Sequence, residues 1–555
     1  MESLTGAEII ARLLERQGVA VVAGIPGGAI LPTYDALSRS TSIRHVLARH
    51  EQGAGFIAHG VARATGKPGV ALASSGPGAT NLLTAIADAK LDSIPLVAIT
   101  GQVPRALIGT DAFQEVDTFG LSIPVAKHGF LVRSAAELLD VVPRAFAIAS
   151  SGRPGPVVID VPRDVQTERA AVAEWSAPGG PGPLPPLDDD AIERAAAMID
   201  AAARPILYLG GGVIQSGAAG TAVELADKIG APAVTTLTAL GAIPTRHPLS
   251  LGMLGMHGAR CTNMALDECD LLIAAGARFD DRATGKAATF CSGAKVIHID
   301  IDPSELGKIR PPEIGIADDV GRVLRAIAGR VARRRRSAWL ARVAALKADF
   351  PLRMPGRDDL RRPYGLVAAV AQCLDDGAIV TTDVGQHQMW VAQSFPFARP
   401  RQWLTSGGLG TMGFGLPAAI GAALAEPERK VVCFSGDGSI LMNLQELATA
   451  AEEQANVKIV LMNNRALGLV HQQQSLFYEG RSIAAKFGAT PDFVKIAEAF
   501  GVHGVDLDYA ADPRLALAAA LAAPGPCLIH ASIDTDERVF PMVPPGAANR
   551  EMIEG

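Results

Sequence analysis

The sequence predicts an α/β protein of three domains, each with a parallel β-sheet covered by helices. Short apolar runs alternate with alanine-rich helical stretches along the whole chain, which is typical of parallel sheets. Two joins without regular patterning divide the chain, and 555 residues exceed what one hydrophobic core holds. The expected domains are residues 1–172, 188–340 and 360–545.

Composition marks both joins. Residues 176–190 read SAPGGPGPLPPLDDD, which holds too many Pro and Gly for a packed element and predicts an extended linker. The second join runs from Arg333 to Pro363, where a basic helical stretch gives way to FPLRMPGRDDLRRP before a helical pattern begins at Tyr364. The basic run Arg333–Arg336 is interpreted as a solvated helix end.

The expected strands are short apolar or β-branched runs, and several end directly in Gly, Ser, Asp or Asn. They are residues 70–75, 96–100, 156–161, 206–212, 271–276, 296–301, 379–385, 431–438 and 459–464. Ligands of open α/β sheets bind at the carboxyl ends of strands, so the chemistry is expected there.

Composition also excludes several classes of protein. A net charge of −6 gives no footprint for nucleic acid, and no apolar run is long enough to span a membrane. The six cysteines form no CxxC pair, so reduced and mostly buried thiols are expected. The N-terminal residues do not read as a signal peptide, which predicts a cytoplasmic protein.

The strongest motif is VVCFSGDGS at 431–439, followed by a helical stretch and the second strand KIVLMNN at 458–464. Asp437 and Asn464 stand 27 positions apart, and a right-handed crossover brings the ends of the two strands side by side. Carboxylate, amide and backbone oxygens suit Mg²⁺ bound to a diphosphate, and Gly436 and Gly438 let the backbone approach phosphates. A GDG tripeptide alone would indicate only a tight turn.

This spacing resembles the thiamine-diphosphate signature of the decarboxylase and synthase superfamily, and the resemblance extends over the whole chain. It implies the thiamine-diphosphate-binding fold with a Rossmann-like middle domain, with Mg²⁺ bound by Asp437, Asn464 and the backbone carbonyl of Ala466. The resemblance assigns the following residues to thiamine diphosphate: Gly27, Gly385, Gln386, His387, Gly410, Met412, Gly436, Gly438, Ser439 and Gly468.

RHEQGAGFIAHGVARATGKPG, at 49–69, resembles the segment that carries the activating glutamate of the family, which falls on Glu51. Thiamine chemistry needs one carboxylate beside the aminopyrimidine ring. The alternative for Glu51 is an ordinary surface position on a helix. Since the family places this glutamate and the diphosphate site on different subunits, the resemblance implies a homodimer or a dimer of dimers.

GIPGGAI (24–30), SSGPGATN (74–81) and GQVPRALIGTDAFQEVDTFG (101–120) resemble acetohydroxyacid synthases. Phe113, Gln114 and Lys127 match positions along the substrate channel of that family, although packing and surface roles remain alternatives for Phe113 and Lys127. Arg282 matches the arginine that binds the carboxylate of the second keto acid. A structural ion pair with Asp280 or Asp281 is its alternative.

The middle segment resembles the FAD-binding domain of these synthases in GGG (210–212), GMLGMHG (252–258), GARFDDRATGK (276–286) and HIDID (298–302). The residues assigned to FAD are Arg153, Gly210, Gly211, Gly212, Met256, His257, Gly276, Arg278, Asp280, Arg282, Asp300 and Asp319. Glycines at strand ends accept a diphosphate and an acidic residue suits a ribose, but neither proves a flavin.

Gln473 stands where many members of the family carry a Trp that favours 2-ketobutyrate and contacts sulfonylureas. Gln473, the run QQQSLFYE and the segment VFPMVPPGAANREM (539–552) instead resemble the valine-sensitive bacterial isozyme I type. The expected consequences are a weak preference for 2-ketobutyrate and weak sulfonylurea inhibition.

The resemblance therefore implies acetolactate synthesis: pyruvate is decarboxylated on thiamine diphosphate, and the remaining hydroxyethyl group is condensed with a second pyruvate or 2-ketobutyrate. This is the first common step of branched-chain amino-acid biosynthesis. A small regulatory subunit is implied as partner. The alternatives are another thiamine-diphosphate flavoenzyme, such as a pyruvate oxidase or a glyoxylate carboligase, and a non-catalytic paralogue. Glu51 argues against the carboligase, which lacks the activating glutamate.

Overall fold

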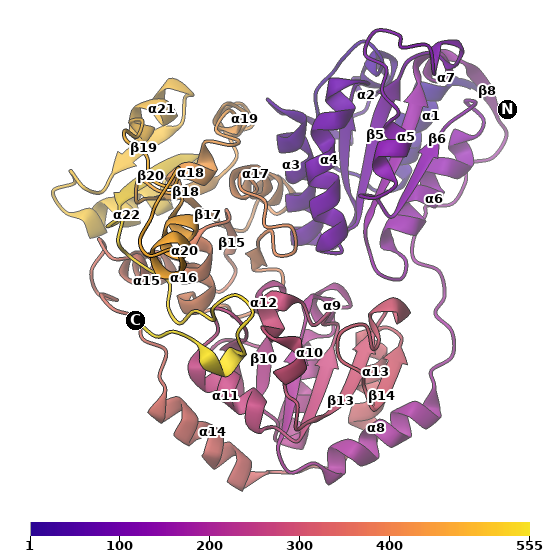
Figure 1. The fold of residues 1–555 in the computed structure, drawn as a ribbon. Helices are drawn as coiled ribbons and strands as arrows, with labels where there is room; N and C mark the ends of the chain where they lie inside the picture. The colour runs from indigo at the N-terminus through magenta and orange to yellow at the C-terminus, as the bar shows by residue number, and fades with distance from the viewer. Residues whose placement is uncertain (1) are drawn as a thin grey trace.

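The computed structural model describes residues 2–555 and contains three six-stranded parallel sheets, one in each third of the chain (Figure 1). The predicted α/β class is confirmed. Residue 1, where the first predicted domain begins, lies outside the described residues. In Figure 1 the N-terminal and C-terminal thirds lie side by side, and the middle third lies below both.

The N-terminal sheet has the strand order β3-β2-β4-β5-β7-β6. Its strands are β2 (Val21–Gly24), β3 (Arg44–Leu47), β4 (Gly69–Ala73), β5 (Leu96–Gln102), β6 (His128–Leu131) and β7 (Pro156–Pro162). A separate antiparallel pair is formed by β1 (Glu2–Thr5) and β8 (Arg169–Val172). The helices are α1 (Gly6–Arg16), α2 (Leu31–Leu37), α3 (Glu51–Thr65), α4 (Pro77–Leu91), α5 (Thr118–Ser122), α6 (Leu138–Ser150) and α7 (Arg163–Thr167), with a 3-10 turn at Arg105–Leu107.

The middle sheet has the order β11-β10-β9-β12-β13-β14. Its strands are β9 (Pro205–Leu209), β10 (Ala233–Thr235), β11 (Ser250–Met253), β12 (Leu271–Ala275), β13 (Lys295–Asp300) and β14 (Ile314–Ala317). The helices are α8 (Asp189–Ala201), α9 (Gly211–Gln215), α10 (Ala219–Ile229), α11 (Arg260–Glu268), α12 (Asp281–Thr284), α13 (Val320–Arg330) and α14 (Ser337–Asp349), with 3-10 turns at Leu237–Ala239, Ala287–Thr289 and Pro303–Glu305.

The C-terminal sheet has the order β16-β15-β17-β18-β20-β19. Its strands are β15 (Ile379–Thr382), β16 (Trp403–Leu404), β17 (Val431–Gly436), β18 (Val457–Asn463), β19 (His503–Asp506) and β20 (Cys527–Ser532). The helices are α15 (Pro363–Gln372), α16 (Gln386–Ser394), α17 (Gly415–Ala425), α18 (Asp437–Ile440), α19 (Glu446–Glu452), α20 (Gly468–Phe477), α21 (Phe493–Ala499) and α22 (Pro513–Ala522), with a final 3-10 turn at Asn549–Glu551.

In each sheet the first strands run toward one edge and the next strands toward the other, and this reversal fixes where ligands can bind. After β2, β9 and β15, the next strand along the chain is added toward one edge of the sheet. β4, β12 and β17 then lie on the other side of these strands, and the following strands are added toward the opposite edge. A crevice opens outside the carboxyl ends of the two strands at such a point. The three reversals therefore define three candidate sites. Their strands were predicted from the sequence, with the exception of β2.

The N-terminal and C-terminal domains pack through α3 and α17, which touch along glycine and alanine faces. A β-carbon at Gly60 would overlap with the carbonyl oxygen of Ala418, and one at Gly421 would overlap with that of Ile57. The absence of a side chain at both glycines lets the two helix backbones approach closely. A larger residue at either position would push the two domains apart.

The segments between the sheets contain the predicted linker and the basic run 333–336. Residues 173–188 contain no helix or strand, and α15 begins at Pro363. The run at 333–336 lies between α13, which ends at Arg330, and α14, which begins at Ser337 with Arg336 as its N-cap. Arg336 donates to the carbonyl oxygen of Ala202, so it anchors the connection to the middle domain.

The six cysteines form no disulfide among the described residues, and only Cys373 is not fully buried. None of the helices within residues 2–555 has the length and apolar character that crossing a bilayer requires.

Asp160 on β7 gives a prediction about stability. Thr100 Oγ1 and Gln102 Nε2 donate to its carboxylate at 2.7 and 2.9 Å, and burial raises its pKa to about 7. Since the unfolded state ionises first, stability falls as pH rises from the ordinary Asp range to about 7. Asp160→Asn removes this dependence, which amounts to at most about 1.4 kcal/mol per pH unit.

Thermal unfolding measured between pH 5 and pH 8 tests this expectation. The midpoint of Asp160→Asn should gain on the unmodified chain as pH rises. A constant difference across that range would contradict it.

Candidate active site and nucleotide-sized cavity

The reversal point of the C-terminal sheet holds a buried carboxylate. Asp437 begins α18 directly after β17, and neither of its carboxylate oxygens has a hydrogen-bond partner. Burial raises its pKa to about 6, opposed by nearby backbone amides that include those of Arg465 and Ala466 after β18. A buried carboxylate without partners is costly, so the position fits a bound cation.

Asn464 lies beside Asp437 because β17 and β18 are paired in parallel, with Gly436 opposite Met462. Asn464 Oδ1 accepts from the Ala466 amide at 3.2 Å, and Asn464 Nδ2 donates to Gln386 Oε1 at 2.9 Å. Two of the predicted metal ligands, Asn464 and Ala466, thus share one turn, and Gln386 at the start of α16 accepts a hydrogen bond from it.

Three predicted glycines keep this crevice free of side chains. A β-carbon at Gly438 would lie 2.6 Å from Leu467 Cδ2, and one at Gly468 would overlap with Gln386 Oε1. A β-carbon at Gly436 would lie 2.9 Å from His387 Nδ1. Each glycine therefore leaves room for a neighbouring side chain, which a β-carbon at that position would displace.

His387 is buried, and its Nε2 atom has no hydrogen-bond partner. Burial lowers its pKa to about 3, so the ring is neutral. Gly385 precedes α16, and its β-carbon would lie 2.6 Å from the His387 ring, while Ser439 Oγ accepts from the Gly436 amide at 3.2 Å. An unpartnered imidazole nitrogen and buried backbone amides fit phosphate oxygens.

The loop 405–412 carries Gly410, at φ +70°, and the half-buried Met412. It is held by two aspartates of the N-terminal domain. Asp88 Oδ2 accepts from Thr411 Oγ1 at 2.8 Å, and the Asp92 carboxylate accepts from the backbone amides of Gly407 and Gly408 at 2.9 and 2.7 Å. We call Asp88, Asp92 and their partner Arg63 the loop anchor.

The loop anchor is buried and charged. Arg63 Nη2 lies 2.6 Å from Asp92 Oδ2 and 3.4 Å from Asp88 Oδ1. Burial raises the pKa of Asp88 to about 6, whereas Arg63 and the loop amides overcome burial and hold the pKa of Asp92 below its ordinary value. No pattern in the apolar stretch around Asp88 and Asp92 indicated this role, because the partners come from another domain.

Glu51 is the first residue of α3, at the reversal point of the N-terminal sheet. Asn81 Nδ2 on α4 donates to Glu51 Oε2 at 2.9 Å, and a β-carbon at Gly78 would lie 3.3 Å from Glu51 Oε1. Gly27 follows β2 and packs on Ser74. A β-carbon at Gly27 would lie 2.5 Å from the β-carbon of Ser74. Within residues 2–555, no hydrogen bond or ion pair links Glu51 to the predicted metal ligands.

A cavity of about 1120 Å³ lies where the three domains meet, at the reversal point of the middle sheet. Every residue that the sequence assigned to FAD lines this cavity, with the exception of Gly210. A β-carbon at Gly210 would overlap with the carbonyl oxygen of Gly276, so Gly210 serves the packing of β9 on β12. Gly410 and Gln473 also line the cavity, which brings residues from two predicted sites together.

Charged groups line one part of this cavity. Arg153 Nη1 donates to Glu305 Oε1 at 2.8 Å, and burial raises the pKa of Asp300 to about 6. Asp319 caps α13 by accepting from the Arg322 amide at 2.9 Å. The cavity lining therefore contains both a guanidinium and acidic groups.

Other lining residues have local partners. The Asp280 side chain accepts from the Arg282 and Ala283 amides at 3.1 Å each. The Arg282 side chain is 66% exposed, and its Nη1 atom lies 3.7 Å from Asp281 Oδ2, a loose pair that leaves the other guanidinium donors available. Arg278 and Met256 line the same wall, and His257 Nδ1 lies 3.1 Å from the Pro541 carbonyl oxygen of the returning C-terminal segment.

The predicted substrate residues are dispersed in the single chain. Phe113 is 88% exposed, and Gln114 adopts φ +59° in the same loop. Lys127 Nζ donates to the carbonyl oxygens of Ile148 and Ser151 at the end of α6, and burial lowers its pKa to about 8. Of the predicted substrate set, the cavity brings together only Arg282 and Gln473.

Comparison with known proteins agrees with this geometry. Models described as the N-terminal TPP binding domain, the central domain and the C-terminal TPP binding domain of thiamine pyrophosphate enzymes match residues 4–121, 192–327 and 383–531. The acetolactate synthase isozyme 1 large subunit of Escherichia coli is 61% identical over 99% of the chain and 97% of its own length. The isozyme 2 large subunit of the same organism is 47% identical over 99% and 100%, and chloroplastic acetolactate synthase 2 of Nicotiana tabacum is 44% identical over 100% and 85%.

Proposed function

Because the chain belongs to the acetolactate synthase large-subunit family of thiamine pyrophosphate enzymes, we propose that it converts two pyruvates to acetolactate and carbon dioxide. With 2-ketobutyrate as acceptor the product is acetohydroxybutyrate. Both products lead to branched-chain amino acids. The observation that carries the proposal is the unbroken similarity over all three domains together with the unpartnered Asp437 carboxylate.

The C-terminal reversal point would hold the diphosphate and Mg²⁺. Asp437, Asn464 and the Ala466 carbonyl are the proposed metal ligands, and His387 with the amides around Gly438 would face phosphate. Thiamine diphosphate supplies the carbon nucleophile that decarboxylation and ligation need. The chain contributes orientation, exclusion of water and, at Glu51, a carboxylate that exchanges a proton with the aminopyrimidine ring.

The large cavity would hold FAD. Its volume and its mixed charged lining support a dinucleotide, and Gly211 and Gly212 at the start of α9 can approach a diphosphate. Because ligation involves no net oxidation, the flavin would serve structure. Arg282 at the cavity wall would bind the carboxylate of the acceptor keto acid.

We further propose a homodimer in which Glu51 completes the site of the partner subunit. Exposed apolar side chains around the predicted substrate loop support a contact surface: Phe113 is 88% exposed and Ile123 66%. The relatives are named large subunits, which supports a small regulatory subunit as a second partner.

The proposal is tested by incubating the purified chain with pyruvate, thiamine diphosphate, Mg²⁺ and FAD and assaying acetolactate, with each cofactor omitted in turn. Acetolactate should form only with thiamine diphosphate and Mg²⁺. Oxygen or quinone consumption without acetolactate would instead indicate a pyruvate oxidase.

Gln473 gives a prediction about the acceptor. Its side chain lines the cavity, and replacing it with Trp adds apolar surface against which the extra methyl group of 2-ketobutyrate can pack. One methylene is worth about 1–3 kcal/mol in a pocket, so Gln473→Trp should raise the preference for 2-ketobutyrate over pyruvate about 10-fold or more.

Competition assays with both keto acids measure this preference. Gln473→Ala is the matched control, since it removes the amide without adding a ring, and its preference should stay near that of the unmodified chain. Equal preferences in the Trp and Ala variants would contradict the proposed place of Gln473.

A further inference from the structure

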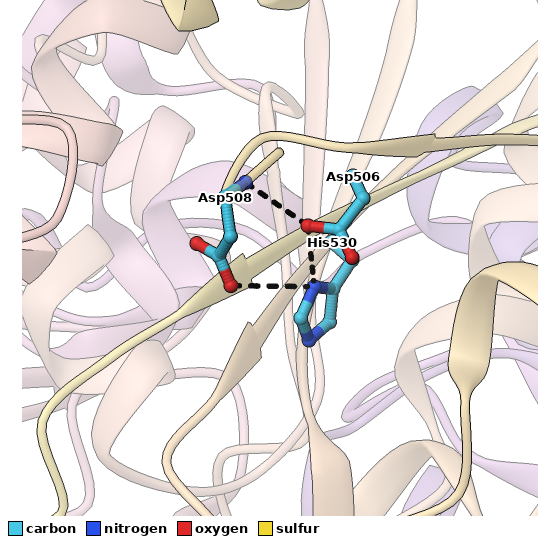
Figure 2. Close-up of side chains that lie close together, drawn as sticks. All are labelled: Asp506, Asp508 and His530. Atoms are coloured by element: carbon cyan, nitrogen blue, oxygen red, sulfur yellow. Dashed lines mark hydrogen bonds and ion pairs between the residues drawn. The ribbon is translucent and has the colours of Figure 1, made fainter. Parts of the chain in front are cut away.

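His530 on β20 lies between two aspartates and the turn that carries the proposed metal ligands. Figure 2 shows Asp506 and Asp508 on one side of its ring. His530 Nδ1 is 3.2 Å from Asp506 Oδ1 and 3.8 Å from Asp508 Oδ2. On the other side, His530 Nε2 lies 3.0 Å from Asn463 Nδ2 at the end of β18.

The backbone fixes how the proton is placed on His530. The Arg465 amide donates to Asn463 Oδ1 at 3.2 Å, and an amide N–H can only donate. The oxygen of Asn463 therefore faces Arg465, so its nitrogen faces His530 and donates to Nε2. With Nε2 as acceptor, the neutral ring carries its proton on Nδ1, which faces the two carboxylates.

This arrangement argues against a second cation site, although ligand atoms of Asp506, Asp508 and His530 lie within 4.8 Å of one another. A metal on Nδ1 would require a proton on Nε2, which would oppose the N–H of Asn463. The candidate cation site is empty, and its ring nitrogen, Nδ1, is the one that carries the proton in this tautomer.

The turn after Asn463 contains a residue in an unfavourable backbone conformation. Arg465 adopts φ +54°, in the left-handed region that is costly for a non-glycine residue. Asn464 and Ala466, on either side of Arg465, are the proposed metal ligands. The bond from the Arg465 amide to Asn463 Oδ1 therefore stabilises the backbone conformation that sets both ligand atoms.

We propose that His530, oriented by Asp506 and Asp508, is a positioning residue that holds Asn463 and through it the metal-binding turn. The inference rests on the proposed function, since it requires Mg²⁺ at Asp437, Asn464 and Ala466. Residues behind metal ligands typically contribute about 10–100-fold to metal affinity.

The experiment measures Mg²⁺ binding by calorimetry with thiamine diphosphate in excess, on the unmodified chain and on H530A, H530Q, N463A and the double variant H530A/N463A. H530A should weaken Mg²⁺ about 10–100-fold. H530Q should restore most of the loss, because its amide oxygen can accept from Asn463 Nδ2. The double variant should bind no more weakly than N463A alone, because both changes break one path.

Circular dichroism and thermal midpoints verify that the variants are folded. Unchanged Mg²⁺ affinity in H530A, equal losses in H530A and H530Q, or additive losses in the double variant would each overturn the inference. Two ions bound per unmodified chain and one in H530Q would show a second cation site instead. If the unmodified chain bound no Mg²⁺ with thiamine diphosphate, the proposed function itself would fail, and the inference with it.

Discussion

Glu51→Gln is expected to lower the rate of acetolactate formation by about 10²–10⁴-fold, the usual contribution of a positioned acid or base. Gln keeps the shape of the side chain and can still accept from Asn81 Nδ2, which now donates to Glu51 Oε2 at 2.9 Å. It cannot exchange a proton at neutral pH. The loss should therefore appear in kcat, with the affinity for thiamine diphosphate nearly unchanged.

Glu193→Gln is the matched control for this change. Glu193 lies on α8 with a side chain that is 73% exposed and paired with Arg330. Neither residue lines the large cavity, so activity should be retained. The measurement combines steady-state kinetics with a binding titration of thiamine diphosphate. Carboligation at the unmodified rate in Glu51→Gln would refute the proposed role.

Sequence reasoning could predict the fold because the signals were local. Each of the nine expected strands is present, since apolar runs ending in Gly, Asp or Asn mark buried parallel strands without reference to distant residues. Asp437 and Asn464 could be paired from the same logic, because a βαβ crossover has only one common hand.

What sequence reasoning missed depends on contacts between distant segments. Asp88 and Asp92 lie in an alanine-rich helical stretch, and their partners Gly407, Gly408 and Thr411 follow more than 300 residues later. The same is true of His530, whose partner Asn463 is 67 positions away. Gly210 was assigned to FAD by its position within GGG; it does not line the cavity itself, but it packs on Gly276, which does.

The loop anchor leads to the second large effect, which is expected for Asp92→Ala. The Asp92 side chain is buried. It accepts from the Gly407 and Gly408 amides and pairs with the buried Arg63 side chain at 2.6 Å. Removing the carboxylate leaves two amides without partners and Arg63 with only Asp88, 3.4 Å away. Breaking a buried pair in this way costs about 3–5 kcal/mol.

The structural effect should concentrate in the loop 405–412. This loop is bound by the loop anchor, carries Gly410 and Met412, and lines the large cavity. Hydrogen exchange of this loop should therefore accelerate in Asp92→Ala, and the thermal midpoint should fall. Asp35→Ala is the control, because Asp35 forms an ion pair of the same 2.6 Å length with Arg39, but its side chain is 72% exposed. Water replaces the lost partner there, so little change is expected. If the two variants were equally stable and their loop amides exchanged equally fast, the loop 405–412 would be held by its own backbone. In that case α4 would not couple the region around Glu51 to this loop.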